Sequence, residues 1–218
     1  GWLYQYYNIE PKAKVFAKPK GEKISKEEIP AATQLFTPDW IVRYMVENSL
    51  GRLWQERNMA QNDHDIGHWE DNNYLRGHWK YYIQEAEQEE SVQRQLEKIR
   101  KEYKNITPES IKVIDPCMGS GHILVYAFDI LMQIYESCGY TQRKASRNIL
   151  NNNIYGFDID KRAYQLTYFA IMMKARQYNR RILTEGIKPN VYFIENSKDL
   201  SKSALDRMGE YKDKVQKL

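Results

Sequence analysis

A β-branched run leads directly into a glycine-rich turn in the segment Ile111-Lys112-Val113-Ile114-Asp115-Pro116-Cys117-Met118-Gly119-Ser120-Gly121. The run predicts a strand. Apolar residues then recur at intervals of three and four up to Ile134, which predicts a helix to about Ser137. Glycines in such a turn let the backbone approach a ligand closely, and the free amides of a helix start bind polar or anionic groups. The segment therefore predicts a strand, a binding loop and a helix, in that order.

The same alternation of strand and helix continues downstream. We predict a second strand in Ile154-Tyr155-Gly156-Phe157-Asp158, a second helix over residues 161–178, a third strand in Val191-Tyr192-Phe193-Ile194, and a short helix over residues 141–150. Strands that alternate with helices form a parallel sheet with right-handed crossovers. The sequence therefore predicts an α/β fold. Ligands of such sheets bind outside the carboxyl ends of the strands, where the glycine-rich turn lies.

The segment ahead of the sheet is predicted to be helical. Thr37-Pro38-Asp39 is a strong helix start, because threonine can cap, proline suits the first helical position, and an acid is favourable at the positive end of the helix dipole. We expect this helix to run to about Ser49 or beyond, with Gly51 as a candidate stop. Residues 58–80 break any period, and residues 81–104 predict a charged surface helix.

The lysines of the N-terminal part indicate a different kind of segment. Residues 1–30 carry six lysines among prolines and a glycine, which predicts an exposed basic lead-in that is poorly ordered. We therefore divide the chain into this lead-in, a helical N-terminal region over residues 31–104, and a core with the first three strands over residues 105–218. Because the chain opens with Gly1 and not with methionine, we expect it to be a segment of a longer protein.

Composition narrows the class of protein. Of the 218 residues, 42% are hydrophobic and 28% are charged, which permits a buried core. No run of about 18 apolar residues occurs, so no membrane span is predicted. The two cysteines are too few for a disulfide scaffold, and we expect a reducing, cytoplasmic location. The net charge of +4 permits a nucleic-acid partner without requiring one.

An acidic cluster follows the second predicted strand. A carboxylate at the tip of that strand can accept hydrogen bonds from both hydroxyls of a ribose. We assign this function to Asp158, and we assign Asp160 to the cap of the following helix. The loop lacks the third glycine of the dinucleotide pattern, because Leu124 stands in its place. This substitution disfavours NAD and leaves room for a nucleoside without a pyrophosphate.

Two motifs and one upstream element resemble those of DNA methyltransferases. Asp115-Pro116-x-x-Gly119-Ser120-Gly121-His122 is similar to the S-adenosylmethionine loop of amino-methyltransferases, and Gly156-Phe157-Asp158-Ile159-Asp160 is similar to their second motif, which holds the ribose-binding acid. Thr37-Pro38 resembles the element that contacts the methionine end of the cofactor in adenine-N6 DNA methyltransferases of the gamma arrangement. Asn196-Ser197 stands where this family usually has an acid near the cofactor adenine.

Residues 29–51 and 1–7 resemble, more narrowly, the adenine-specific methyltransferases of BREX phage-defence systems. The resemblance implies a partial Rossmann-like methyltransferase sheet with helical N-terminal elements, and S-adenosyl-L-methionine as the cofactor. For the full-length protein it implies methyl transfer to N6 of an adenine flipped out of double-stranded DNA, with other phage-defence subunits as further partners. The cofactor-binding residues implied are Phe36, Thr37, Pro38, Asp115, Pro116, Cys117, Gly119, Ser120, Gly121, His122, Asp158, Ile159, Asn196 and Ser197.

The catalytic Asn/Asp-Pro-Pro-Tyr/Phe motif of that family is missing from the sequence, because none of the seven prolines is adjacent to another. We therefore expect the chain to hold the cofactor half of the enzyme, to contain no catalytic residue and to be inactive alone. Two other functions stay open, namely a non-catalytic DNA- or partner-binding module regulated by the cofactor, and a protein-glutamine methyltransferase. The position of Thr37-Pro38 ahead of the loop favours DNA.

Some side chains have two interpretations. Cys117 follows a proline, as the nucleophile of cytosine-C5 methyltransferases does, but we expect it to line the cofactor pocket or to pack as a small apolar side chain. His64 and His68 are four residues apart, as zinc ligands can be, but we expect solvent-exposed histidines and no metal site. Trp40 is expected to pack at the helix start, with cofactor contact as the alternative.

Overall fold

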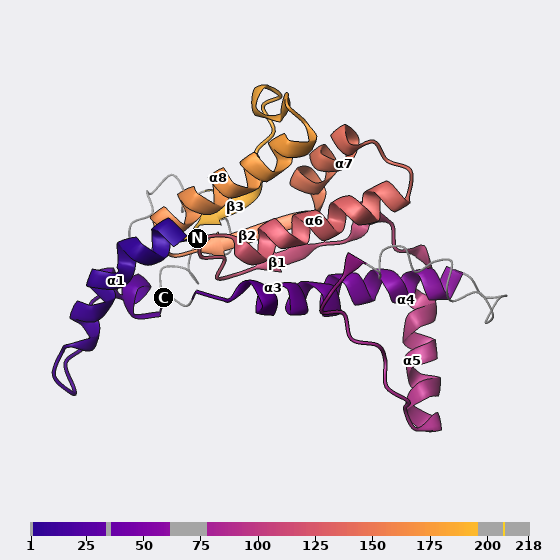
Figure 1. The fold of residues 1–218 in the computed structure, drawn as a ribbon, viewed down its shortest axis with the longest axis horizontal. Helices are drawn as coiled ribbons and strands as arrows, with labels where there is room; N and C mark the ends of the chain where they lie inside the picture. Colours follow the sequence, from indigo (N-terminus) through magenta and orange to yellow (C-terminus); the bar gives the residue numbers. More distant parts are fainter. Residues whose placement is uncertain (1, 34–35, 62–77, 196–206, 208–218) are drawn as a thin grey trace.

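The structure, a computed structural model, describes residues 2–33, 36–61, 78–195 and 207 (Figure 1). The helices are α1 (Trp2–Phe16), α2 (Ile29–Thr33), α3 (Asp39–Val46), α4 (Arg52–Gln61), α5 (Glu90–Glu102), α6 (His122–Ser137), α7 (Gln142–Asn148) and α8 (Lys161–Tyr178). Shorter helical turns are η1 (Lys26–Glu28), η2 (Glu47–Gly51), η5 (Tyr103–Asn105), η6 (Pro108–Ser110), η7 (Ile149–Asn153) and η8 (Ile182–Thr184). Of the helices in these ranges, none is long and apolar enough to cross a lipid bilayer.

Three strands form one parallel sheet. They are β1 (Val113–Asp115), β2 (Ile154–Asp158) and β3 (Asn190–Phe193), and they lie in the order β1-β2-β3. Ile114 pairs with Tyr155, and Gly156 pairs with Val191. The predictions of three strands, of their parallel pairing and of an α/β fold are confirmed. Because all three strands point the same way, Asp115 and Asp158 end their strands at the same edge of the sheet.

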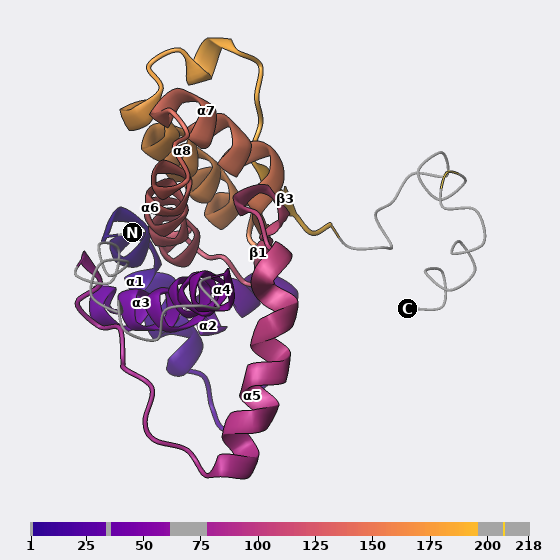
Figure 2. The same ribbon diagram turned by 90° about the vertical axis from the view of Figure 1, so that its right-hand side faces the viewer.

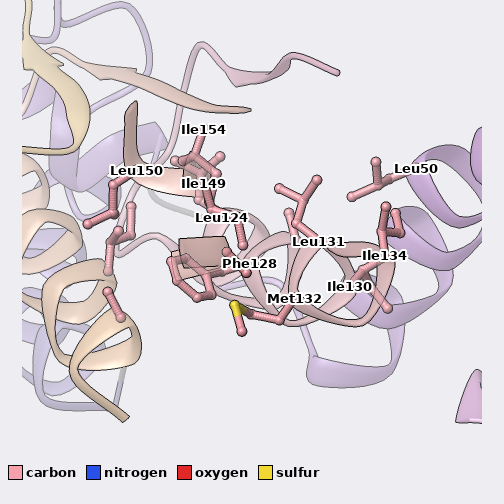
Figure 3. Close-up of a cluster of buried hydrophobic side chains, with 14 of the residues drawn as sticks. Leu50, Leu124, Phe128, Ile130, Leu131, Met132, Ile134, Ile149, Leu150 and Ile154 are labelled. Carbon is pink, nitrogen blue, oxygen red and sulfur yellow. The ribbon is translucent and has the colours of Figure 1, made fainter. Parts of the chain in front are cut away.

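The core lies between the sheet and α6. This helix contacts β1, β2, α3, α7 and α8, and Figure 2 shows α6, α7 and α8 together on one side of the strands. Its apolar residues recur at helical spacing, so one continuous face is removed from water. The fully buried side chains of that face include Leu124, Phe128, Leu131 and Ile134, and they pack with Ile149, Leu150 and Ile154 (Figure 3). The predicted bounds of α6 and α8 are confirmed. The predicted short helix over residues 141–150 is present as α7, which ends at Asn148 and continues into the π-helical turn η7.

The helix that begins after Thr37-Pro38 does not stop at Gly51. The chain stays helical from Asp39 to Gln61, passing from α3 through the π-helical turn η2 into α4. Gly51 packs against an aromatic ring: a Cβ atom there would lie 2.8 Å from Cζ3 of Trp79. The prediction of a stop was wrong because this glycine provides room for a tryptophan, and it does not provide a turn.

The segment ahead of α5 departs from the predicted helix. Residues 82–89 are not helical, and α5 begins only at Glu90. Side chains of the α3–α4 run hold the backbone of this segment instead. Glu47 Oε2 accepts a hydrogen bond from the amide of Tyr81 at 2.6 Å, and Asn48 Oδ1 accepts one from the amide of Ile83 at 2.8 Å. Backbone groups satisfied by side chains need no helix. This segment leads away from the other elements, and α5 runs back toward them so that its C-terminal end lies beside α4 (Figure 2).

The prediction of a poorly ordered lead-in over residues 1–30 was wrong for most of that range. Trp2–Phe16 form α1, although Pro11 lies inside it, and Lys26–Glu28 form η1. The cause is tertiary packing: α1 contacts α2, and Val15 of α1 and Ala31 of α2 are both buried. Burial of one face stabilises a helix that local propensity alone does not predict. Nothing in the structure tests where independent domains begin and end, so that division stays a prediction.

Candidate functional site

The turn between β1 and α6 lies on the end of β2. The amide of Met118 donates to the carbonyl oxygen of Phe157 at 3.0 Å, and the amide of Gly119 donates to Oδ2 of Asp158 at 2.8 Å. The amide of Cys117 donates to Oδ1 of Asp115 at 3.1 Å. Residues 116–121, which we call the glycine loop, are therefore bonded to the tips of both strands. The loop is built by contacts between segments about 40 residues apart in sequence.

Two glycines of the loop have left-handed backbone angles. The φ angle is +51° at Gly119 and +82° at Gly121, a region that other residues rarely adopt. Gly121 is also crowded, since a Cβ atom there would lie 2.8 Å from Cγ2 and Oγ1 of Thr167 in α8. The glycines therefore allow the loop to reverse direction and allow α6 to begin close to α8.

A cavity of about 380 Å³ lies beside the glycine loop. Its volume falls within the roughly 300–1,000 Å³ that is typical of ligand sites. The residues that line it come from the loop, from the tip of β2 and from the N-terminal part of the chain. They are Pro30, Thr33, Phe36, Thr37, Pro116, Cys117, Gly119, Ser120, Asp158, Ile159 and Asp160. The cavity thus lies at the carboxyl ends of β1 and β2, where parallel sheets bind their ligands.

Eight of the residues predicted for the site line this cavity together, although they span about 120 positions of the sequence. These eight are Phe36, Thr37, Pro116, Cys117, Gly119, Ser120, Asp158 and Ile159. The predicted residues Asn196 and Ser197 lie outside the described part of the chain, as do His64 and His68. Among the residues that the structure does describe, no group of three or more histidines, cysteines and acids could hold a metal ion.

The other predicted residues support the loop without lining the cavity. Asp115 is buried beneath the loop and accepts the bond from Cys117. Pro38 is the N-cap residue of α3, and Gly121 precedes α6. The ring of His122 meets the ring of Phe36 edge to face, with centroids 4.8 Å apart. His122 therefore attaches the Thr37 element to the start of α6.

The two acids at the tip of β2 have different partners. Asp160 Oδ1 accepts a hydrogen bond from the amide of Arg162 at 2.9 Å, which confirms its predicted capping of α8. Asp158 accepts bonds through both oxygens, from the amide of Asp160 at 2.7 Å and from the amide of Gly119 at 2.8 Å. Because a carboxylate can accept about four hydrogen bonds, Asp158 retains acceptor capacity toward the cavity that it lines.

Burial shifts two pKa values around the loop. Burial raises the pKa of Asp115 above its ordinary value, and the neighbouring Asp158 carboxylate adds to this effect, while the bond from Cys117 opposes it. Burial lowers the pKa of His122, which favours the neutral imidazole, while Asp39 and the backbone of Thr37 act in the opposite direction. Burial therefore disfavours the charged forms of Asp115 and His122, the two titratable side chains that support the glycine loop.

Sequence reasoning missed four residues of the site, one of which is Asp160, which lines the cavity in addition to capping α8. Pro30 and Thr33 of α2 form part of the cavity wall, and Thr167 of α8 donates a hydrogen bond from its hydroxyl to the carbonyl oxygen of Gly119 at 2.8 Å. Pro30 and Thr33 precede the helix start at Thr37, but nothing in their spacing indicates that α2 lies beside the glycine loop. Thr167 lies inside a regular helical pattern, and no feature of the sequence distinguishes it from its neighbours in that helix.

Comparison with known proteins gives a consistent family. Residues 86–193 match the family described as MmeI, DNA-methyltransferase domain. The chain is 48% identical over 206 residues to the adenine-specific methyltransferase PglX of Lacticaseibacillus casei (strain Zhang), a match that covers 90% of this chain. It is 47% identical over 198 residues to the adenine-specific methyltransferase BrxX of Escherichia coli O9:H4 (strain HS), a match that covers 91% of this chain.

These matches involve only a small part of the two relatives. The aligned region is 15% of the length of PglX and 15% of the length of BrxX. Because each match covers at least 90% of this chain, the aligned region includes the glycine loop and the sheet. The chain is therefore a homologue of one segment of the adenine-specific methyltransferases PglX and BrxX.

Proposed function

We propose that the cavity beside the glycine loop binds S-adenosyl-L-methionine, and that the chain is the cofactor-binding part of a DNA adenine-N6 methyltransferase with a Rossmann-like sheet. One observation carries the proposal: the glycine loop, the acid at the tip of β2 and Thr37 line a single cavity at the carboxyl ends of two parallel strands. The similarity to PglX and BrxX, both adenine-specific methyltransferases, supports the reaction class.

The lining fits a nucleoside with an amino-acid tail. Asp158 retains acceptor capacity for ribose hydroxyls, and Ile159, which is about half exposed at the cavity, offers an apolar surface to the adenine ring. The glycine loop and the Thr37 element would hold the methionine end. Asn196 and Ser197, outside the described residues, are proposed near the adenine. The bound cofactor supplies an already activated methyl group, so these residues need only bind and orient it.

Methyl transfer requires parts that this chain does not contain. The sequence has no adjacent prolines, so the Asn/Asp-Pro-Pro-Tyr/Phe motif must come from the remainder of the full-length protein. We propose double-stranded DNA as the substrate of that protein, with the target adenine flipped out of the duplex, and phage defence of the BREX type as its context. The relation to PglX and BrxX supports this context.

Cofactor binding can be tested with the two cysteines of the chain. Both are exposed thiols, but only Cys117 lines the cavity, whereas Cys138 follows the far end of α6. S-adenosylmethionine should slow alkylation of Cys117 in a saturable manner and leave the rate at Cys138 unchanged, as measured by peptide mass spectrometry. NAD at the same concentration should protect neither thiol. Equal reactivity of Cys117 with and without saturating S-adenosylmethionine would rule out this binding site.

The reaction class needs a separate assay. The full-length protein should transfer a labelled methyl group to adenine in duplex DNA, whereas the isolated chain should transfer none. Transfer to a glutamine-containing peptide instead would replace DNA by protein as the substrate. Protection of Cys117 without transfer to either substrate would leave a module that only binds the cofactor.

A further inference from the structure

The backbone on both sides of Gly119 is held by side chains from two other elements. Its amide donates to Oδ2 of Asp158 at 2.8 Å, and its carbonyl oxygen accepts from Oγ1 of Thr167 at 2.8 Å. The amide belongs to the peptide group before Gly119, and the carbonyl belongs to the one after it. Because peptide groups are planar, orienting both of them determines φ and ψ of Gly119 together.

Packing alone does not hold Gly119 in place. No atom lies within 4 Å of the position that a Cβ atom would occupy at this residue, so no neighbour restricts the backbone from that side. At Gly121 the equivalent position is only 2.8 Å from Thr167. Glycine is also the residue with the greatest backbone freedom. The conformation of Gly119 therefore depends on its two hydrogen bonds, whereas the conformation of Gly121 is also restricted by packing against Thr167.

Thr167 provides one of these bonds and does not itself line the cavity. It is fully buried in α8 and is absent from the cavity lining. A hydroxyl has a single proton to donate, and in helices threonine often donates it to a carbonyl of the preceding turn. Here the proton goes to the carbonyl of Gly119, 48 residues away. A valine of the same shape would fill the space but leave that carbonyl without this donor.

We propose that Thr167 is a positioning residue of the cofactor site. Together with Asp158 it fixes Gly119, and so it sets the orientation of Cys117 and Ser120, which line the cavity on either side. A loop that is already in its binding conformation does not lose backbone entropy when a ligand arrives, so the affinity is higher. This inference rests on the proposed function, because it concerns the same cavity and the same ligand.

Four variants isolate the hydroxyl from the rest of the side chain. Thr167→Val removes it at constant shape, and Thr167→Ser retains it without the methyl group. Thr167→Ala, compared with Thr167→Ser, removes the same hydroxyl from a smaller side chain. Ser146→Ala is the matched control: Ser146 in α7 is also fully buried, and its hydroxyl donates to the carbonyl of Arg143 at 3.1 Å, outside the loop.

Two measurements are made on each variant in the full-length protein. The first is the alkylation rate of Cys117 relative to Cys138 without cofactor, which reports on the loop itself. The second is the concentration of S-adenosylmethionine that gives half-maximal protection of Cys117. We expect Thr167→Val to change the first at least twofold and to raise the second about three- to tenfold, in line with the loss of one hydrogen bond. Thr167→Ser should match the wild type, and Ser146→Ala should change neither.

The outcomes distinguish the two proposals. If the wild type shows no protection by S-adenosylmethionine, the proposed function fails, whereas the cofactor-free rates still report whether Thr167 holds the loop. If Thr167→Val behaves as the wild type in both measurements, the positioning role is overturned. Where Thr167→Val does not fold, the pair Thr167→Ser and Thr167→Ala decides, and equal values for these two would equally overturn the inference.

Discussion

At the scale of single residues, the two glycines of the loop should respond differently to the same substitution. Alanine at either position must adopt a left-handed backbone, which costs about 1–2 kcal/mol. At Gly121 the new Cβ atom would also meet the buried Thr167 at 2.8 Å, and overpacking of this kind costs a further 1–3 kcal/mol or so. Urea unfolding should therefore show a larger loss for Gly121→Ala than for Gly119→Ala. Equal losses would mean that α8 can move away from the loop.

Asp115 should make stability depend on pH. Its folded-state pKa is raised by burial, so the folded chain binds the proton more tightly than the unfolded chain does. The stabilising effect is complete below the ordinary value of 3.8 and is lost as the pH rises through the folded-state pKa.

The variant Asp115→Asn tests this dependence. It keeps the oxygen that accepts from Cys117 and removes the charge. Its melting temperature should therefore equal that of the wild type near pH 3.8 and exceed it at pH 7, in thermal scans without ligand. A variant that melts lower at pH 7 would contradict the assigned cause.

How much of the site could be predicted depended on the kind of residue. Asp158 ends the second predicted strand, and Gly119 and Ser120 lie in the turn after the first one, so their position in the chain indicates their position in the sheet. Thr167 lies in the middle of a helix, and its function is set by which residue happens to lie opposite. A sequence pattern identifies residues whose role depends on their position within their own helix or strand. It does not identify residues whose role depends on a contact with another helix or loop.

At the scale of elements, Glu47 joins three segments through one buried carboxylate. Its Oε1 accepts from the hydroxyl of Tyr126 in α6 at 2.6 Å, and its Oε2 accepts from the amide of Tyr81 at 2.6 Å. Glutamine has only one acceptor oxygen, so its amide group would face one of these donors. We expect Glu47→Gln to cost about 1–3 kcal/mol in urea unfolding.

A double-mutant cycle tests this reasoning. Tyr126→Phe removes one of the two donors, so the double variant Glu47→Gln/Tyr126→Phe should lose less stability than the sum of the single variants. Strict additivity would show that the two side chains do not interact. Glu47 lies in η2, so the cycle also reports whether the π-helical turn is held against α6.

Glu185 joins the turn after η8 to α7 and to the end of α8. Its carboxylate accepts from Nε of Arg147 at 2.6 Å, from Arg143 at 3.1 Å and from Asn179 at 3.2 Å. The bond from Arg147 is the main cause that lowers the pKa of Glu185 to about 2. A lowered pKa contributes stability above the unfolded value of 4.5, and this stability is lost as the pH falls toward 2.

The variant Glu185→Gln should therefore melt at a lower temperature than the wild type at pH 7. The difference should shrink as the pH falls between 4.5 and 2, because the wild type then loses the same charge. A difference in melting temperature that is constant across this range would show that packing, and not ionisation, accounts for the effect of Glu185.

Some elements could be predicted and others could not, for physical reasons. The strand over residues 154–158 and the helix over residues 161–178 have strong local patterns, so their bounds follow from periodicity. The first strand was predicted from residue 111, but β1 begins only at Val113. In α1, Pro11 and scattered lysines hide the helix, and burial of Val15 against α2 stabilises it. The π-helical turn depends on the bonds of Glu47, which a sequence pattern does not contain.

At the scale of the whole molecule, one face of the sheet is uncovered in the described part of the chain. Ile114, Tyr192 and Ile194 are each about half exposed or more, and the ring of Tyr192 stacks on that of Phe157 with centroids 5.7 Å apart. Among the described strands, β1 pairs only with β2, so its other edge is open. Parallel sheets are usually covered on both faces, and exposed edges promote association.

We therefore expect the isolated chain to associate with itself. Light scattering after size-exclusion chromatography should show a mass above that of a monomer, and the double variant Ile114→Lys/Tyr192→Lys should shift it toward the monomer. A matched variant, Leu183→Lys, changes an equally exposed apolar residue on η8 and should leave the mass unchanged. A monomeric wild type would contradict the expectation.

The wall that α2 gives to the cavity has a practical consequence for protein engineering. Pro30 and Thr33 complete the site from beyond the predicted border at residue 105, and α2 in turn packs on α1. Excising residues 105–218 as a minimal unit would leave an open half-site with the loop and Asp158 but without Thr37 or the α2 wall. A transplantable version of this site must start at the very first helix.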